Sequence, residues 1–351
     1  MLNSLQGGRN EKRNKYNAFN YQRYTWSGRS DTYRDINRWR VQIEFWSDIG
    51  AWMCSSWQFI AYHQHDKKQE KTDIAKSKFN GGDNMQIKIG SFDITECWDG
   101  VFYKTLSEYP QITDWEIQNV LDFIRYEKKH GRSCEIEAED SILQKIEDYK
   151  NDGSHRISPP TIIKECTACP KYKGCMTDLI CHTSPIKNAE KIMDCGCLLS
   201  PVLSRGLTAK ELKAESRNAA NDPEDYFDYI MFAWGNCQAG DRLVMERKLG
   251  RFPNEKDLSK GFTPGVRFFF RYDKLAQHPD ATFDGVLPLK VKNRVVLSDW
   301  IWAIIVPADY KSVFEVHIPK ELKPKVHYLQ SDCKDIWEWS EKVYEFAKSL
   351  K

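Results

Sequence analysis

The sequence predicts an α+β protein, with helices before residue 155 and strands concentrated after it. Two stretches of the first half, 113–131 and 137–150, have apolar residues at helical spacing. Several stretches of the second half are dense in β-branched and aromatic residues and are separated by turn residues. An amphipathic pattern over 335–351 predicts a closing helix.

Local signals mark where these elements begin and end. Thr113 and Glu116 have the spacing of a capping box, in which each side chain accepts the other residue's backbone N–H. The segment NDGSHRISPP at 151–160 interrupts the chain with a glycine and a proline pair. The sequence therefore predicts an α+β accessory or target-recognition domain over 33–155 and a second domain over 156–351.

Five strands are expected in the second half, and alternation in MQIKIGSFDI (85–94) predicts one in the first. The five are GVRFFFRYDKL (265–275), GVLPLKVKNRVVL (285–297), WIWAIIVP (300–307), VFEVHIP (313–319) and KVHYL (325–329).

The charge of the chain is unevenly distributed. Its formal net charge is only +2, but residues 1–40 hold nine Lys or Arg against three acids, interleaved with seven aromatic residues. Guanidinium groups bind phosphates and aromatic rings stack on bases, so this composition suits single-stranded nucleic acid. A solvated, solubilising segment is the alternative. We expect residues 1–32 to be a basic, flexible segment and a nucleic acid to be a plausible partner.

The cysteine content bears on the compartment. The chain has no apolar run long enough to span a membrane, and its first residues lack the apolar core of a signal peptide. We therefore expect a cytoplasmic protein with no membrane contact. In a reducing cytosol, the 11 cysteines favour buried thiols or metal ligands over disulfides.

Four closely spaced cysteines form a candidate metal site: Cys166, Cys169, Cys175 and Cys181. The first two make a C-x2-C motif, whose turn can point two thiolates at one ion. A tetrahedral zinc ion or a [4Fe-4S] cluster would fit four thiolates. The fourth position is open, because Cys195, Cys197 and Cys134 compete for it. A set of unrelated buried thiols is the alternative.

A His-Thr-Ser triplet follows the last of these cysteines directly. The segment LICHTSPIKNAEKIMDCGCLLSP predicts a short strand, the triplet His182, Thr183 and Ser184, a helix and a glycine turn. An imidazole and a hydroxyl at the end of a strand can hydrogen-bond a ribose diol and a carboxamide. A helix cap next to a packed histidine is the alternative.

This pattern resembles the ADP-ribosyltransferase superfamily, including its poly(ADP-ribose) polymerase-like domains. The matching residues are His182, Thr183, Ser184, Asn188, Ile192, Gly196 and Leu198. A second segment, SVFEVHIPKELKPKVHYLQ, is similar to the family's final catalytic strand and puts Glu315 at its glutamate, with Asp299 as the alternative. The resemblance covers residues 178–330. It implies a catalytic domain with a split, mixed or antiparallel β-sheet and with the cysteine-rich metal knot at its start.

The family's middle strand carries an aromatic residue that stacks on nicotinamide. In YFDYIMFAWG, Phe232 and Ala233 align with the family's motif and put Met231 where its tyrosine would be. Tyr229, two residues earlier on the same strand face, is therefore the candidate. Residues 235–290 would then form an insertion whose Arg and Lys side chains could meet cofactor phosphates or a target, with a surface lobe as the default alternative.

The resemblance implies an enzyme that splits NAD and transfers ADP-ribose to a macromolecular acceptor, a nucleic acid or a protein. A toxin or defence effector would suit this activity. The catalytic residues would be His182, which orients a ribose, Tyr229, which stacks on nicotinamide, and Glu315, which stabilises the oxocarbenium-like state. NAD would contact His182, Thr183, Ser184, Asn188, Tyr229 and Phe232.

Two alternatives stay open at this point. An RNA 2′-phosphotransferase-like enzyme would also use NAD on this scaffold, with several active-site Arg or His residues. A non-enzymatic, metal-stabilised nucleic-acid-binding protein would use the His-Thr-Ser segment only as a cap. The sequence does not identify a partner protein that restrains the activity.

Overall fold

The computed structural model describes residues 84–92, 95–98, 100–152, 156–165, 173–215 and 223–350. These residues all belong to one compact unit, Gly50–Lys351. The expected basic segment 1–32, the part of the accessory domain before residue 84, and the candidate ligands Cys166 and Cys169 lie outside the described residues.

A four-stranded sheet with two helices forms the first described region. Its strands are β1 (Asn84–Gly90), β2 (Glu96–Trp98), β3 (Val101–Thr105) and β4 (Ser133–Glu137), in the order β2-β3-β1-β4. Strand β1 is parallel to both β3 and β4, whereas β2 is antiparallel to β3. The helices are α1 (Asp114–Lys129) and α2 (Asp140–Asn151).

The expected capping box starts α1. The Thr113 hydroxyl accepts from the backbone N–H of Glu116, and the Glu116 carboxylate accepts from the backbone N–H of Thr113. The helix packs on the sheet through its apolar stripe, where the ring of Phe123 stacks on that of Phe102 with centroids 4.4 Å apart. Both helices expected in this region, and the strand expected at its start, are therefore confirmed.

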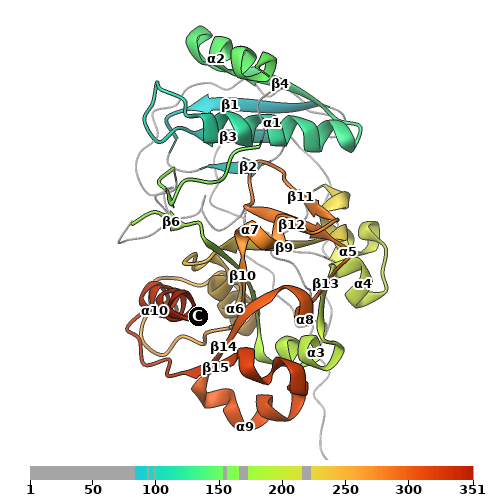
Figure 1. The fold of residues 1–351 in the computed structure, drawn as a ribbon, viewed down its shortest axis with the longest axis vertical. Helices are drawn as coiled ribbons and strands as arrows, with labels where there is room; N and C mark the ends of the chain where they lie inside the picture. The colour runs from blue at the N-terminus through green and yellow to red at the C-terminus, as the bar shows by residue number, and fades with distance from the viewer. Residues whose placement is uncertain are drawn as a thin grey trace, which may run out of the picture. The chain divides into compact units, whose positions relative to one another are not determined.

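A mixed seven-stranded sheet forms the second region (Figure 1). Its strands, in spatial order, are β11 (Ala281–Thr282), β12 (Leu289–Lys292), β9 (Tyr229–Trp234), β7 (Leu179–Ser184), β10 (Val266–Arg271), β14 (Ile301–Pro307) and β15 (Val326–Leu329). All neighbours are antiparallel except β14 and β15. The chain is thus an α+β protein with a large mixed sheet in its C-terminal part.

Helices cover both faces of this sheet. Residues of α3 (Ile186–Cys195) share a buried core with Phe268 and Phe270 of β10. Residues of α6 (Ala239–Leu249) and α10 (Ile336–Ser349) share a second core with Phe269 on the opposite face. Successive side chains of a strand point to opposite faces, so one run of phenylalanines serves both cores.

Shorter elements complete this region. They are β5 (Ile162–Ile163), β6 (Cys175–Met176), β8 (Cys197–Leu199), β13 (Arg294–Val296), α4 (Pro201–Arg205), α5 (Ala209–Glu215), α7 (Tyr272–Leu275), α8 (Leu297–Trp300), α9 (Lys311–Phe314) and the 3-10 helices η2 (Glu224–Asp228), η3 (Ala308–Tyr310), η4 (Glu315–His317) and η5 (Lys320–Lys325). None of the helices in the described ranges combines the length and the apolar character needed to cross a membrane.

Two expectations about the chain's course are wrong. The segment 313–319 is not a strand, because it folds into the end of α9 and then η4. Phe314 is buried there while Val313 and Val316 are exposed, so its apolar residues do not line one strand face. Residues 235–290 are not an insertion either, because they supply α6 and the strand β10, which pairs with both β7 and β14.

Candidate functional site

The candidate site opens where two neighbouring strands separate. Strands β7 and β9 form only two residue pairs, Ile180 with Trp234 and Cys181 with Ala233. Beyond these pairs β7 stays bonded to β10 through Ser184, and β9 stays bonded to β12 back to Tyr229. Because each strand keeps its outer partner but loses the inner one, the sheet splits and a gap forms between them.

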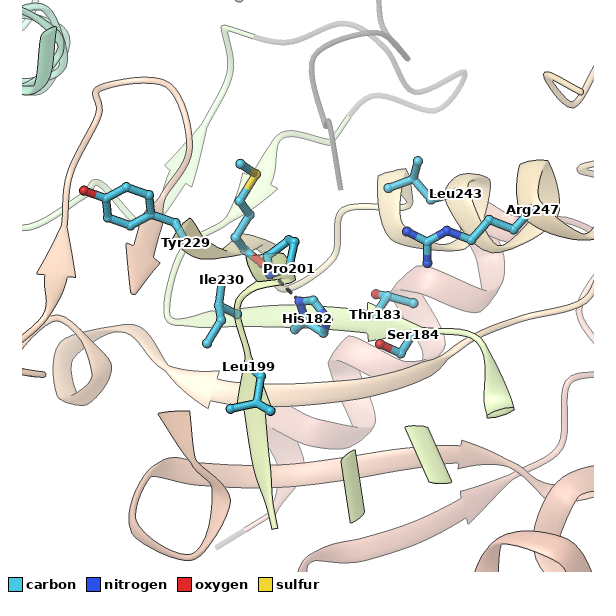
Figure 2. A pocket seen from close by; sticks show the side chains of 10 residues that line it. His182, Thr183, Ser184, Leu199, Pro201, Tyr229, Ile230, Leu243 and Arg247 are labelled. Atoms are coloured by element: carbon cyan, nitrogen blue, oxygen red, sulfur yellow. Dashed lines mark hydrogen bonds between the residues drawn. The ribbon is translucent and has the colours of Figure 1, made fainter. Parts of the chain in front are cut away.

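A pocket occupies this gap (Figure 2). The space between the strands amounts to about 490 Å³ when the open mouth is included, whereas the cavity volume proper is about 30 Å³. Its lining comes from β7, β9, β8, α4 and α6. The lining residues are His182, Thr183, Ser184, Leu199, Pro201, Tyr229, Ile230, Met231, Leu243 and Arg247. All three residues of the His-Thr-Ser triplet therefore line one hollow, with the side chains of His182 and Ser184 on one face of β7 and that of Thr183 on the other.

The tautomer of His182 follows from its contact with β9. Its Nδ1 lies 3.2 Å from the carbonyl oxygen of Met231. A carbonyl only accepts, so Nδ1 carries the hydrogen and Nε2 keeps a free lone pair. The pKa of His182 is lowered to about 4, mainly by burial; the hydrogen bond to Met231 acts in the opposite direction, and the positive charge of Arg247 adds to the lowering. The imidazole is therefore neutral near pH 7, and its Nε2 can accept a hydrogen bond from a hydroxyl.

The two hydroxyls of the triplet differ in their surroundings. Ser184 is only 1% exposed, and its Oγ has no hydrogen-bond partner among the residues that the structure describes. A buried polar atom without a partner is costly, so one that lines a pocket is a natural contact for a ligand. Thr183 instead packs tightly: a Cβ added at Gly240 would lie 2.4 Å from its side chain, and one at Gly265 would lie 2.6 Å from it.

Helix α6 brings a cation to the pocket. Arg247 and Leu243, one turn apart, both line the hollow above Thr183 (Figure 2). The helix is held against the sheet by a buried ion pair, because Asp241 of α6 lies 2.5 Å from Arg267 of β10. Both side chains are fully buried. The sequence indicated that basic residues of this segment could meet phosphates, and the structure places one of them in the pocket.

The candidate stacking residue Tyr229 lines the pocket, but its ring turns away from His182 (Figure 2). The ring packs with Tyr126 of α1, Tyr226 and Met231 in a separate buried cluster. Its hydroxyl lies 3.4 Å from Nε2 of His130. Tyr229 therefore lines the pocket because of its position on β9, but its ring is not stacked into the hollow.

A buried cation holds this aromatic cluster in place. Nζ of Lys290 on β12 lies 3.4 Å from the ring centroid of Tyr226 and 4.2 Å from that of Tyr126. It also pairs with Asp284 at 2.6 Å, with both side chains fully buried. Cation–π contacts gain strength when they are desolvated. This packing explains why the aromatic side chains face α1 and Lys290.

The other expected NAD contacts do not line the hollow. Phe232 is buried in the core and meets the ring of His182 edge-on, with centroids 6.3 Å apart. Asn188 is half-buried on α3. Glu315 is exposed in η4, and Asp299 is exposed in α8. The structure thus does not bring either carboxylate to His182, and none of the ten described lining residues is an acid.

The candidate metal ligands are only partly described. Cys181 is buried in β7, and burial raises the pKa of its thiol to about 12. Its Sγ lies 3.7 Å from the carbonyl oxygen of Trp234 and 3.9 Å from that of Gly235, to which a thiol can donate. Cys175 is half-buried on β6. Within the described ranges, no three His, Cys, Asp or Glu side chains gather closely enough to hold a metal ion, and the zinc or iron–sulfur site stays a prediction.

Comparison with known proteins gives no match to a family model, a curated protein or a solved structure. The functional argument therefore depends on the chemistry of the pocket. That chemistry offers, within one hollow, a neutral acceptor nitrogen, a cation, and a buried hydroxyl with no partner among the described residues.

Proposed function

We propose that the chain is an ADP-ribosyltransferase-like enzyme that binds NAD in the pocket between β7 and β9 and transfers ADP-ribose to a macromolecular acceptor. The observation that carries this proposal is the split of the sheet, which leaves His182, Thr183 and Ser184 lining one hollow. The bond between nicotinamide and the ribose C1′ breaks, and a bond from C1′ to an acceptor oxygen or nitrogen forms. Nicotinamide leaves, and the acceptor loses one proton.

The pocket groups match the functional groups of such a ligand. The neutral His182 can accept a hydrogen bond from a ribose hydroxyl at Nε2. The Oγ of Ser184 can both donate to and accept from a carboxamide. Arg247 can bind a diphosphate through paired N–H donors.

The protein residues act here by binding and orientation. Holding the ribose by its hydroxyl and the diphosphate by its charge fixes the C1′ atom relative to an incoming acceptor, which lowers the entropic part of the barrier. We assign no carboxylate to the reaction, because both acidic candidates are exposed away from the pocket. Likewise, Tyr229 is assigned a place in the pocket wall but no stacking role.

The test uses purified full-length protein and NAD labelled on its adenine. Release of nicotinamide, and transfer of label to RNA, to single-stranded DNA or to the protein itself, would support the proposal. His182→Ala and Ser184→Ala should both lower nicotinamide release while retaining the wild-type circular dichroism. Binding of nucleic acid without any nicotinamide release from wild type would instead favour the non-enzymatic alternative.

One observation favours a second candidate, an RNA 2′-phosphotransferase-like reaction. Arg247 lies in the hollow, and a phosphate carried by the acceptor would give its guanidinium a charged partner, which a free hydroxyl would not. An oligonucleotide with an internal 2′-phosphate separates the two candidates. NAD-dependent loss of its phosphate would identify the second, and transfer of the adenine label to the oligonucleotide would identify the first.

A further inference from the structure

Two thiols lie against each other at the turn that joins α3 to β8. Sγ of Cys195 is 3.2 Å from Sγ of Cys197. Between them Gly196 has φ of 65°, the left-handed conformation that glycine adopts readily and that reverses the chain here. Cys195 is exposed and Cys197 is buried. One sulfur is thus open to a reagent in solution, and the second lies directly behind it.

We propose that Cys195 and Cys197 form a thiol–disulfide site that reacts with small disulfides of the glutathione class. The Cys195 sulfur, after losing its proton, attacks one sulfur of the small disulfide and releases one small thiolate. The Cys197 sulfur then attacks the mixed disulfide, forms the Cys195–Cys197 bond and releases the second small thiolate. The two protons lost by the protein are taken up by the two released thiolates, and the protein loses two electrons to the small disulfide.

The surroundings of the two sulfurs make Cys195 the attacking thiol and Cys197 the resolving thiol. Cys197 is buried on β8, which pairs with β13. Its sulfur is therefore shielded from solution until a mixed disulfide forms next to it. Cys195 has the exposure that attack on a dissolved disulfide requires.

This turn leads directly into the wall of the pocket. Leu199 ends β8 and Pro201 begins α4, and both line the hollow. Forming the bond would shorten the sulfur separation from 3.2 Å to about 2 Å, which displaces the start of that wall. The consequence for NAD turnover rests on the proposed function, whereas the oxidation itself does not.

Peptide mapping isolates the pair from the other cysteines. Cleavage after Lys191 and Arg205 releases the peptide 192–205, whose only cysteines are Cys195 and Cys197. The folded full-length protein is incubated with oxidised glutathione, then denatured, alkylated and digested. We expect this peptide to lose both alkylation sites and two hydrogens, and to regain both sites after reduction. A peptide that stays fully alkylated would overturn the proposal.

Controls separate this chemistry from general oxidation. The peptide 326–334 holds Cys333 alone and that thiol is buried, so it should keep its alkylation site. Cys197→Ser should trap glutathione on Cys195, because the resolving sulfur is gone, and Cys195→Ser should leave Cys197 unmodified. A dimer linked through Cys195 in the wild type would contradict an intramolecular pair. Because the readout is mass alone, it stands whether or not the protein cleaves NAD.

Discussion

Nδ1 of His182 lies 3.2 Å from the carbonyl oxygen of Met231, at the place where β7 and β9 part. This contact fixes the tautomer of the imidazole and also ties together the two walls of the pocket. It joins residues 49 positions apart in the chain. The chemistry of the site and the geometry of the split sheet therefore depend on the same hydrogen bond.

The first prediction concerns acid stability. Burial lowers the pKa of His182 from 6.5 to about 4 in the folded protein, so below pH 6.5 the unfolded chain binds a proton that the folded chain does not. The free energy of unfolding should fall as the pH drops through this window, by at most about 3 kcal/mol from this group. His182→Asn should remove that part of the loss. Urea unfolding near both ends of the window measures it, and equal losses in the two proteins would contradict it.

A second prediction tests whether the catalytic residues are those that line the pocket or those that the family resemblance implies. Glu315 is exposed in η4, so Glu315→Gln should leave the rate of nicotinamide release within about twofold of wild type. His182→Ala should lower that rate by about a hundredfold, the lower end of the loss seen when one positioned hydrogen-bonding group is removed from an active site. Steady-state release of nicotinamide measures both. A large loss of nicotinamide release in Glu315→Gln, with an unchanged free energy of unfolding, would show that this carboxylate takes part in the reaction.

The third prediction compares two buried serines. Ser184 Oγ has no partner among the described residues, so Ser184→Ala should change the free energy of unfolding by less than about 0.5 kcal/mol but should raise KM for NAD. Ser340 is buried with its hydroxyl against the Arg267 guanidinium, so Ser340→Ala should cost about 1 to 2 kcal/mol with KM unchanged. Urea unfolding and initial rates measure the pair. If Ser184→Ala instead lowered the free energy of unfolding and left KM unchanged, Ser184 would not be a contact of the ligand.

The fourth prediction tests the packing of α6 on β7. A Cβ at Gly240 would lie 2.4 Å from Thr183, so Gly240→Ala should push the helix that carries Arg247 away from the pocket and lower nicotinamide release. Gly131→Ala is the matched control, because φ of +79° makes it strained but no atom lies within 4 Å. It should cost about 1 kcal/mol of stability with nicotinamide release unchanged. Equal activity in both variants would show that the close contact does not position Arg247.

Local signals in the sequence were enough to predict several elements. The capping pair Thr113 and Glu116 fixed the start of α1, and amphipathic spacing located α10. The His-Thr-Ser triplet was expected at the end of a strand followed by a helix, and β7 and α3 have that arrangement. Each of these features depends on residues within one or two turns of each other, which is the range over which sequence patterns are informative.

The features that were missed depend on contacts between distant segments. The segment around Glu315 reads as a strand by composition, but only Phe314 finds a place in the core. The ring of Tyr229 turns toward Tyr126 and Lys290, which lie about 100 and 61 positions away along the chain. The sequence did not indicate that β10 is an inner strand of the sheet, because its pairing partners, β7 and β14, lie on opposite sides of it in the sequence.

The last prediction concerns the buried ion pair beneath the pocket. Arg267 pairs with Asp241, contacts the Gly235 carbonyl oxygen at 3.1 Å and lies opposite Thr183 in the register of β10 and β7. Asp241→Ala should destabilise the protein by about 3 to 5 kcal/mol, because it leaves the guanidinium charge buried without its partner. The double variant Asp241→Leu with Arg267→Met should lose much less stability, because neither charge of this pair then remains buried. Urea unfolding of both proteins measures the difference. A single variant that is no less stable than the double variant would show that the charge is compensated elsewhere, and that α6 is held to the sheet by its apolar contacts alone.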